Sequence, residues 1–109
     1  MNSATQNQPT GIRQGEQAIS LHSVVVVSRE QISCDLLGEA VILDLSGGVY
    51  YGLDEVGARV WASIQAPRTV SDVCEALLEE YDVERPRCES DLLILLQELR
   101  ARNLIEVTE

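Results

Sequence analysis

The chain has 109 residues, 45% of them hydrophobic, and a formal net charge of −10 from 18 acidic side chains against eight arginines and no lysine. This length allows a single domain, and the hydrophobic fraction is sufficient for a packed core. The acidic balance lacks the positive surface that binds phosphate backbones, so we expect no nucleic-acid partner.

The N-terminal segment carries neither a fold signal nor a targeting signal. Residues 1–20 are rich in Asn, Gln, Ser, Thr and Gly, which predicts a flexible tail that contributes little to the core, followed by one domain over residues 21–109. No apolar run reaches the ~20 residues of a membrane span, and no basic stretch precedes an apolar one. We therefore expect a cytoplasmic protein without a membrane partner.

Three apolar stretches predict strands. Val24–Val27 is a β-branched run bounded by polar residues, and the stretches at residues 40–45 and Val49–Leu53 are separated by Ser46, Gly47 and Gly48. A Gly-Gly pair between two strands is typical of a hairpin, because glycine adopts positive φ without a steric penalty. Alternation predicts one buried face made of Val41, Leu43, Leu45, Val49, Tyr51 and Leu53.

Three amphipathic helices follow the strands. Asp54 is placed to cap the first, which ends before Pro67, and Thr69 is placed to cap the second. Pro86 interrupts the pattern, and the third helix is expected from about Cys88 to Arg102. The apolar positions predicted to face the core are Val56, Val60, Trp61, Ile64, Val70, Val73, Cys74, Leu77, Leu78, Tyr81, Cys88, Leu92, Leu95, Leu96 and Leu99.

The end of the chain completes the predicted fold. Asn103 stands where a left-handed residue commonly ends a helix, and residues 104–107 are compatible with a short closing strand. The element order therefore predicts an α+β fold of winged-helix-like size, in which a three-stranded antiparallel sheet is followed by three helices.

The residues needed for catalysis or metal binding are scarce. The chain has one histidine, His22, at the edge of the predicted tail, and three cysteines without a CxxC pair. Neither a nucleophilic triad nor a zinc site of usual composition can be assembled from them, and phosphate-binding glycine motifs are missing. We expect no enzyme activity, metal or cofactor, and we interpret Cys34, Cys74 and Cys88 as reduced, buried thiols.

Two features indicate a binding surface. Val49–Leu53, the last of the three predicted strands, is a candidate edge strand that offers free backbone groups to an extended peptide. The alternative is that Tyr50 and Tyr51 only pack and cap the hairpin. Along the third helix, acidic and apolar positions line up beside the core stripe at Asp91, Leu95, Glu98 and Arg102, with Ile94 next to them. A single exposed Ile is also ordinary on a protein surface.

The order and spacing of several segments resemble the PqqD-like family. The resemblance begins in residues 38–61, which read GEAVILDLSGGVYYGLDEVGARVW, and continues at Arg68-Thr69-Val70. Further matches are Asp91, Leu95, Leu96, Leu99 and Asn103-Leu104-Ile105. The resemblance covers the chain from about Val24 to Val107. Asp54 and Asn103 stand where many relatives have Asn and Gly, and both replacements keep the conformational role.

The resemblance implies a non-catalytic recognition element for ribosomally made precursor peptides. Such domains bind the leader of the peptide by adding it as a strand, and they present it to a modifying enzyme such as a leader peptidase, a cyclase or a radical enzyme. The hairpin looks like those of stand-alone leader-binding proteins of lasso-peptide pathways. Carried over by position, the implied peptide-binding residues are Val49, Tyr50, Tyr51, Gly52, Leu53, Asp91, Ile94, Leu95, Glu98 and Arg102.

Two other functions remain open from the residues alone. A winged-helix DNA-binding regulator fits the architecture, but its candidate recognition helix carries Asp91 and Glu98. A scaffold subunit that binds only another protein is the second alternative. An exposed edge strand also leaves open whether the chain is a monomer or a strand-mediated dimer.

Overall fold

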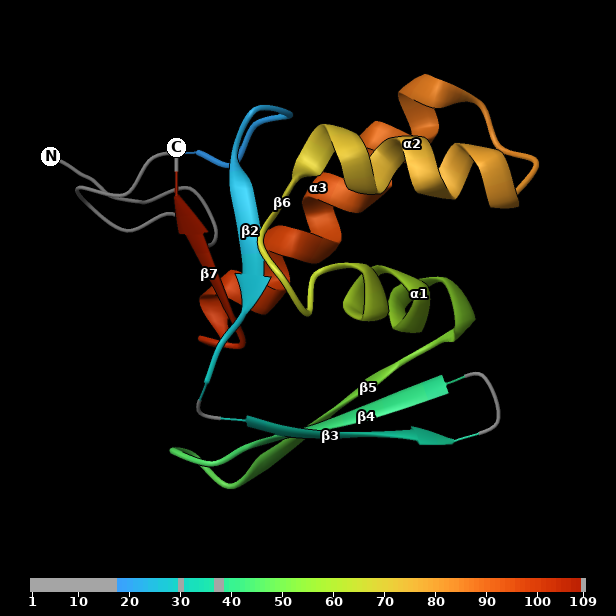
Figure 1. The fold of residues 1–109 in the computed structure, drawn as a ribbon. Coiled ribbons are helices and arrows are strands. Elements are labelled where there is room, and N and C mark those ends of the chain that lie inside the picture. Colours follow the sequence, from blue (N-terminus) through green and yellow to red (C-terminus); the bar gives the residue numbers. More distant parts are fainter. Residues whose placement is uncertain (1–17, 30, 37–38, 109) are drawn as a thin grey trace, which may run out of the picture.

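The computed structural model describes residues 18–29, 31–36 and 39–108 and confirms the α+β class (Figure 1). Within these residues the chain forms two three-stranded antiparallel sheets and three helices. The rest of the predicted tail, residues 1–17, lies outside the described residues.

The first sheet has the order β3-β4-β5, with β3 at Gln31–Leu36, β4 at Glu39–Asp44 and β5 at Val49–Leu53. Residues 45–48 form the turn between β4 and β5, where Gly48 has a φ of 69° and donates its N–H to the Asp44 carbonyl at 2.8 Å. The three antiparallel strands ahead of the helices are thus present, but the first of them is β3 and not Val24–Val27.

The expected first strand belongs to the second sheet. There β2 (Val24–Val27) lies between β6 (Arg68–Thr69) and β7 (Ile105–Thr108). The predicted closing strand is confirmed as β7, and Asn103 just before it has the expected positive φ, at 60°. Both partners of β2 are distant in sequence, so its own residues gave no sign of which sheet it joins.

The sequence prediction assigned the wrong face of β4 to the core. The buried residues of this strand are Ala40 and Ile42, which lie opposite Leu53 and Tyr51 of β5. Residues directly opposite each other in an antiparallel pair project to the same face of the sheet. Unbroken alternation from residue 41 to residue 53 would put Val41 and Leu43 on the same face as Tyr51 and Leu53. Because the four-residue turn pairs Asp44 with Val49, Ala40 and Ile42 take that face instead, and Val41 and Leu43 point outward.

The helices begin largely at their predicted caps. They are α1 (Glu55–Ser63), α2 (Val70–Glu80) and α3 (Arg85–Ala101). The Asp54 carboxylate accepts the Gly57 N–H at 2.8 Å, and the Thr69 hydroxyl accepts the Asp72 N–H at 3.1 Å. The prediction for α3 was wrong at its start: the helix includes Pro86 in its first turn, where the missing N–H has no intrahelical acceptor to lose.

A single cluster of buried apolar side chains joins the two sheets and the helices. Most of the predicted helix positions are in it, together with Val25 of β2 and Ile42 of β4. Ile19, which the sequence analysis assigned to the tail, is also buried, at 5% exposure. Val56 was predicted to face the core, but it is 43% exposed and lines a surface hollow.

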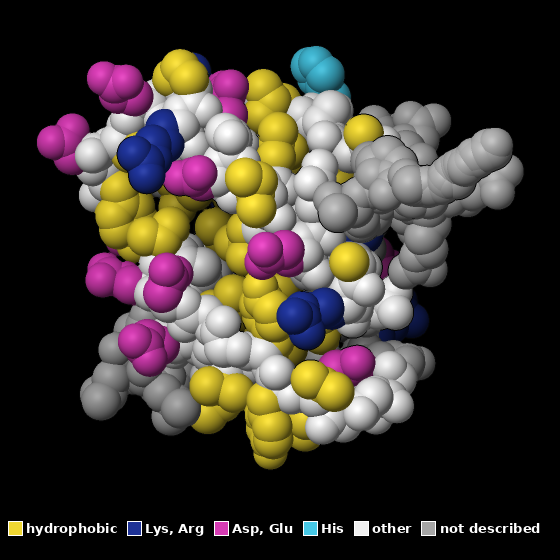
Figure 2. Space-filling model, turned by 180° about the vertical axis from the view of Figure 1, so that it is seen from behind, with side chains coloured by type: hydrophobic (Ala, Val, Ile, Leu, Met, Phe, Trp, Pro, Cys, Tyr) yellow, Lys and Arg dark blue, Asp and Glu magenta, His cyan; other side chains and the backbone are white. Residues whose placement is uncertain are grey.

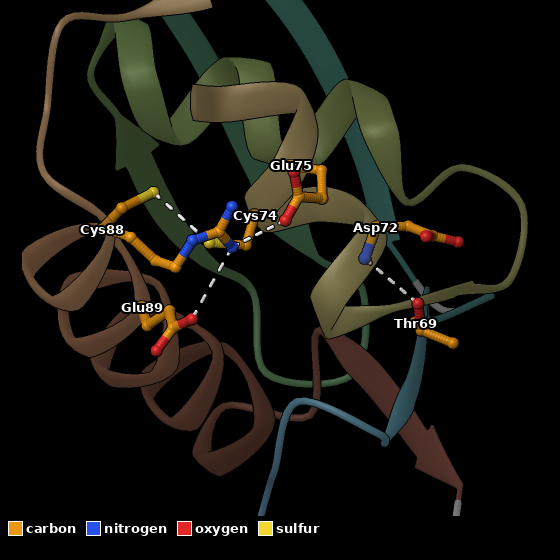
Figure 3. Close-up of polar contacts among 7 residues, drawn as sticks. Thr69, Asp72, Cys74, Glu75, Cys88 and Glu89 are labelled. Atoms are coloured by element: carbon orange, nitrogen blue, oxygen red, sulfur yellow. Dashed lines mark hydrogen bonds and ion pairs between the residues drawn. The ribbon is translucent and has the colours of Figure 1, made fainter. Parts of the chain in front are cut away.

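Two of the three cysteines hold α2 and α3 close together (Figure 3). The Sγ atoms of Cys74 and Cys88 are 3.7 Å apart, and burial raises the pKa of the Cys74 thiol to about 11. Above this pair, Arg85 binds Glu75 across the helix interface at 2.6 Å. Cys34 was also expected to be buried, and this was wrong: it lies exposed on β3.

Candidate peptide-binding groove

The strand β5 lies at the edge of its sheet. Among the described strands only β4 pairs with it, so the backbone groups on its other side have no strand partner there. The burial of its side chains increases along the strand: Val49 and Tyr50 are exposed at 54% and 69%, Tyr51 is half-buried and Leu53 is buried. The predicted edge position is therefore confirmed, and half of the backbone hydrogen-bonding groups of β5 point away from β4.

Tyr51 connects this strand to α3. Its hydroxyl donates a hydrogen bond to Glu98 Oε1 at 2.9 Å, and the Arg102 guanidinium lies 4.7 Å from the centre of its ring. Partial burial, followed by the hydrogen bond to Glu98, raises the pKa of Tyr51 above the usual tyrosine value. The strand residue and the two helix residues, 47 or more positions apart in the chain, thus form one contact.

A groove of about 550 Å³ runs between β5 and the two helices α1 and α3. It is lined by Tyr51, Gly52, Leu53, Asp54, Val56, Gly57, Asp91 and Leu95. Five of the ten residues predicted to bind peptide therefore lie on one groove, and they come from both predicted surfaces. Its lining combines apolar side chains such as Leu53 and Leu95 with two acidic residues, Asp54 and Asp91.

A second hollow of about 230 Å³ lies on the other side of Tyr51. It is lined by Asp44, Val49, Tyr51, Arg102, Asn103 and Leu104. Two more of the predicted residues, Val49 and Arg102, are found here. Tyr51 is therefore the residue that both hollows share.

Three predicted residues line neither hollow. Glu98 contacts the groove indirectly, through the Tyr51 hydroxyl. Ile94 is 53% exposed on α3, one turn from both Asp91 and Glu98. Tyr50 lies opposite Leu43 in the ladder and therefore projects from the other face of the sheet, away from the buried side that Tyr51 occupies.

An apolar pocket that the sequence did not reveal opens beside the groove. It has a volume of about 210 Å³ and lies between the three helices, lined by Val56, Val60, Leu77, Tyr81, Val83, Cys88, Asp91, Leu92 and Leu95. It shares Val56, Asp91 and Leu95 with the groove. The sequence analysis assigned the apolar residues Val56 and Leu95 to the core and gave no sign of this pocket. In the structure, the exposure of Val56 shows that the helices do not close completely here.

Acidic side chains surround this apolar surface. Figure 2 shows hydrophobic side chains in a band across the face behind that of Figure 1, hollowed on one side and flanked by Asp and Glu. Asp91 lies 3.5 Å from Arg87, but both side chains are well exposed, so the pair is weak. The carboxylates at the rim therefore favour a ligand that carries positive charge beside apolar side chains.

The groove combines several features that suit the binding of a peptide. Among the described residues no group of three or more His, Cys, Asp or Glu side chains is placed to hold a metal ion. None of the helices in that part of the chain has the length and apolar character of a membrane span. A free strand edge, apolar recesses and a charged rim together suit an extended peptide.

Comparisons with known proteins agree with this geometry. The sequence profile of the family described as coenzyme PQQ synthesis protein D (PqqD) matches residues 39–105. The chain is similar to TbiB1, solved in complex with the TbiA(beta) leader peptide, with a TM-score of 0.71 and 34% identity over 74% of this chain and 94% of that one. A lasso peptide synthetase B1 complexed with the leader peptide has a similar fold, with a TM-score of 0.68 and 24% identity over 75% and 96% of the two chains. No curated protein matches the chain in sequence.

Proposed function

The chain belongs to the PqqD family, and on that premise we propose that it is a non-catalytic adaptor for a ribosomally synthesised precursor peptide. The adaptor binds the leader segment of the peptide and presents the rest to a modifying enzyme of a lasso-peptide pathway. It acts in the cytoplasm, where ribosomal peptides are made. The leader-peptide complexes of two proteins of similar fold support this proposal.

The observation that carries the proposal is the free edge of β5 beside the groove. A leader segment pairs with β5 as a fourth strand, and the ladder of backbone hydrogen bonds supplies affinity without regard to sequence. Side chains on one face of that strand enter the groove against Leu53 and Leu95. Lys or Arg side chains of the leader meet Asp91 and Glu98, which selects for a basic leader and speeds the encounter.

The DNA-binding alternative has no support in the arrangement of charge. The exposed side of α3 that would enter a groove of DNA carries Asp91 and Glu98, and Arg102 lies over the ring of Tyr51. A strand-mediated dimer would occupy the same edge of β5 and compete with the leader.

An amide chemical-shift titration tests the adaptor function. The ligand is the leader of any short precursor peptide encoded beside the gene of this protein. We expect saturable chemical-shift changes at Val49–Leu53 and at residues 91–102. We also expect a Glu98→Arg variant to bind the leader roughly three- to tenfold more weakly, because it loses a negative charge at the rim of the groove. Glu79→Arg, an exposed site on α2, makes the same charge change and is expected to bind like the parent chain.

Two results would contradict the proposal. Scattered or absent shifts at millimolar leader would remove the adaptor function, and equal affinity of the Glu98 and Glu79 variants would remove the helix side of the site. Spectra of both variants without leader show whether the fold is intact.

A further inference from the structure

The sheet β3-β4-β5 has a second apolar face. In its register Ile32 lies opposite Leu43, which lies opposite Tyr50, and Cys34 lies opposite Val41, which lies opposite Gly52. Residues in such rows project from the same side of a sheet. We call this side the outer face, and the apolar side chains on it are those of Ile32, Cys34, Val41, Leu43 and Tyr50. The register also places one charged residue on this side, Glu39 at the start of β4.

The described elements leave the outer face uncovered. The helix α1 packs against β4 and β5 on the other side, where Ala40 and Ile42 are buried (Figure 1). Figure 2 shows hydrophobic side chains projecting at the lower end of the molecule, over this sheet. Ile32 is 57% exposed and Tyr50 69% exposed, at opposite edges of the same patch.

The composition of β4 indicates that this face is covered in the working protein. The run Ala40-Val41-Ile42-Leu43 is apolar at every position, whereas a strand with one face in water alternates between apolar and polar residues. Continuous apolar runs are typical of strands covered on both sides. An apolar patch that spans three strands on an otherwise strongly charged surface marks an interaction site.

We propose that the outer face docks the modifying enzyme, an inference that rests on the function proposed above. The reason is continuity with the peptide site, because Tyr50 and Gly52 of the outer face belong to β5, whose free edge receives the leader. A leader strand added there extends the sheet by one strand and contributes its own outward side chains. An enzyme seated on the outer face therefore contacts adaptor and peptide together.

Charge favours an enzyme over a second copy of this chain. Two copies would bring together two net charges of −10, and like charges disfavour association. The middle of the outer face is apolar and Glu39 lies at one end of it, so its partner needs an apolar patch beside basic side chains. A protein of that kind gains electrostatic attraction from the rest of the adaptor.

An enzyme that contacts adaptor and leader together has a thermodynamic consequence for both binding steps. The enzyme binds the leader-loaded adaptor more tightly than the empty one, and by linkage the enzyme raises the affinity of the adaptor for the leader by the same factor. A gain of about five- to tenfold is expected, within the usual range of coupling between two sites.

Cys34 provides a direct measurement, because it is the exposed cysteine of the three and lies on the outer face. Cys74 and Cys88 are buried and serve as silent internal references. Mass spectrometry follows the reaction of Cys34 with N-ethylmaleimide under two conditions. One contains the leader peptide alone, and the other contains a purified modifying enzyme whose gene lies beside that of this protein. Leader alone leaves the rate unchanged, since it binds two strands away. Saturating enzyme slows the reaction by about tenfold or more, since the buried core of an interface excludes water and reagent.

A pair of variants completes the test. Ile32→Asp puts a charge into the apolar patch on its β3 side and is expected to weaken enzyme binding by about tenfold or more, because a buried unpaired charge is costly. Leader affinity stays unchanged, since Ile32 lies at the opposite edge of the sheet from the groove. Ala62→Asp, an exposed site on α1, adds the same charge and leaves enzyme binding intact.

The outcomes separate the two proposals. Failure of the leader titration removes the adaptor function itself. If leader binding is normal, three results overturn the docking inference alone. They are an unprotected Cys34, an Ile32→Asp variant that binds the enzyme like the parent chain, and a complete absence of enzyme binding. Protection that appears with rising concentration of the adaptor by itself also overturns it and assigns the face to a second copy.

Discussion

At the scale of single residues, the two adjacent tyrosines of β5 have different roles. The sequence placed Tyr50 and Tyr51 together on the peptide-binding strand, and no local signal separates them. The pleat of the strand does, because neighbouring side chains project from opposite faces. Tyr51 lines both hollows and donates a hydrogen bond to Glu98, whereas Tyr50 lies on the outer face. The residue type alone therefore does not predict on which face of β5 each tyrosine lies.

The raised pKa of Tyr51 predicts a loss of stability at alkaline pH. The fold favours the neutral phenol, first by partial burial and then by its hydrogen bond to Glu98. The resulting stability is complete below the ordinary tyrosine pKa of about 10 and is lost as the pH rises through the higher pKa of the folded state. Urea unfolding between pH 8 and about 11 measures this, and Tyr51→Phe is expected to show a flatter pH dependence than the parent chain.

One outcome of these urea experiments would contradict the prediction for Tyr51. Other groups also titrate in this range, so part of the decline remains in the variant. Parallel curves for Tyr51→Phe and parent would mean that the phenol is not held in its neutral form by the fold.

At the scale of elements, local signals predicted the helices well and the strands less well. Side-chain caps such as Asp54 and Thr69 act within four residues, and the sequence alone located them. The strand β3 was missed because Gln31–Leu36 mixes polar and apolar residues and is defined by its pairing with β4. The peptide groove was predicted on both sides, but the deep pocket beside it depends on how three helices meet, which no single segment encodes.

The cap of α1 gives a prediction at this scale. Asp54→Ala leaves the Gly57 N–H without its side-chain acceptor at 2.8 Å and is expected to lower the free energy of unfolding by about 1 kcal/mol. Asp54→Asn keeps an acceptor oxygen, and its expected loss is only about 0.3 kcal/mol. Urea denaturation of both variants, followed by circular dichroism, checks this. An equal loss in both would show that the negative charge, and not the cap bond, stabilises the helix.

At the scale of the whole molecule, the two sheets share one core. Apolar side chains from β2 and β7 and from β4 and β5 meet in one cluster with the helices, and the Val27 N–H donates to the Ile64 carbonyl at the end of α1 at 3.0 Å. The sequence predicted enough apolar residues for a packed core, and the buried ones form a single cluster. It did not indicate two sheets, because β2 pairs with β7, about 80 positions away along the chain.

A shared core predicts a single unfolding transition. Trp61 of α1 is the one tryptophan of the chain and is 3% exposed, so its fluorescence reports on the packing between α1 and the rest. Circular dichroism reports on all helices and strands. The two urea curves are expected to coincide, as in a two-state domain. An earlier fluorescence transition would mean that α1 and the sheet β3-β4-β5 unfold separately from the remainder.

The pairing of β2 with β7 also bears on how such a domain can be tethered. Val24 lies opposite Thr108, so β2, near the start of the described residues, and β7, at their end, lie side by side in a different sheet from the one that carries the groove (Figure 1). A polypeptide linker attached after β7 therefore starts from the sheet that carries neither the β5 edge nor the outer face. Joining the domain to its enzyme would then replace a bimolecular encounter by an effective concentration in the millimolar range for a short flexible linker. The same surfaces thus serve equally well in a separate protein and in one part of a longer chain.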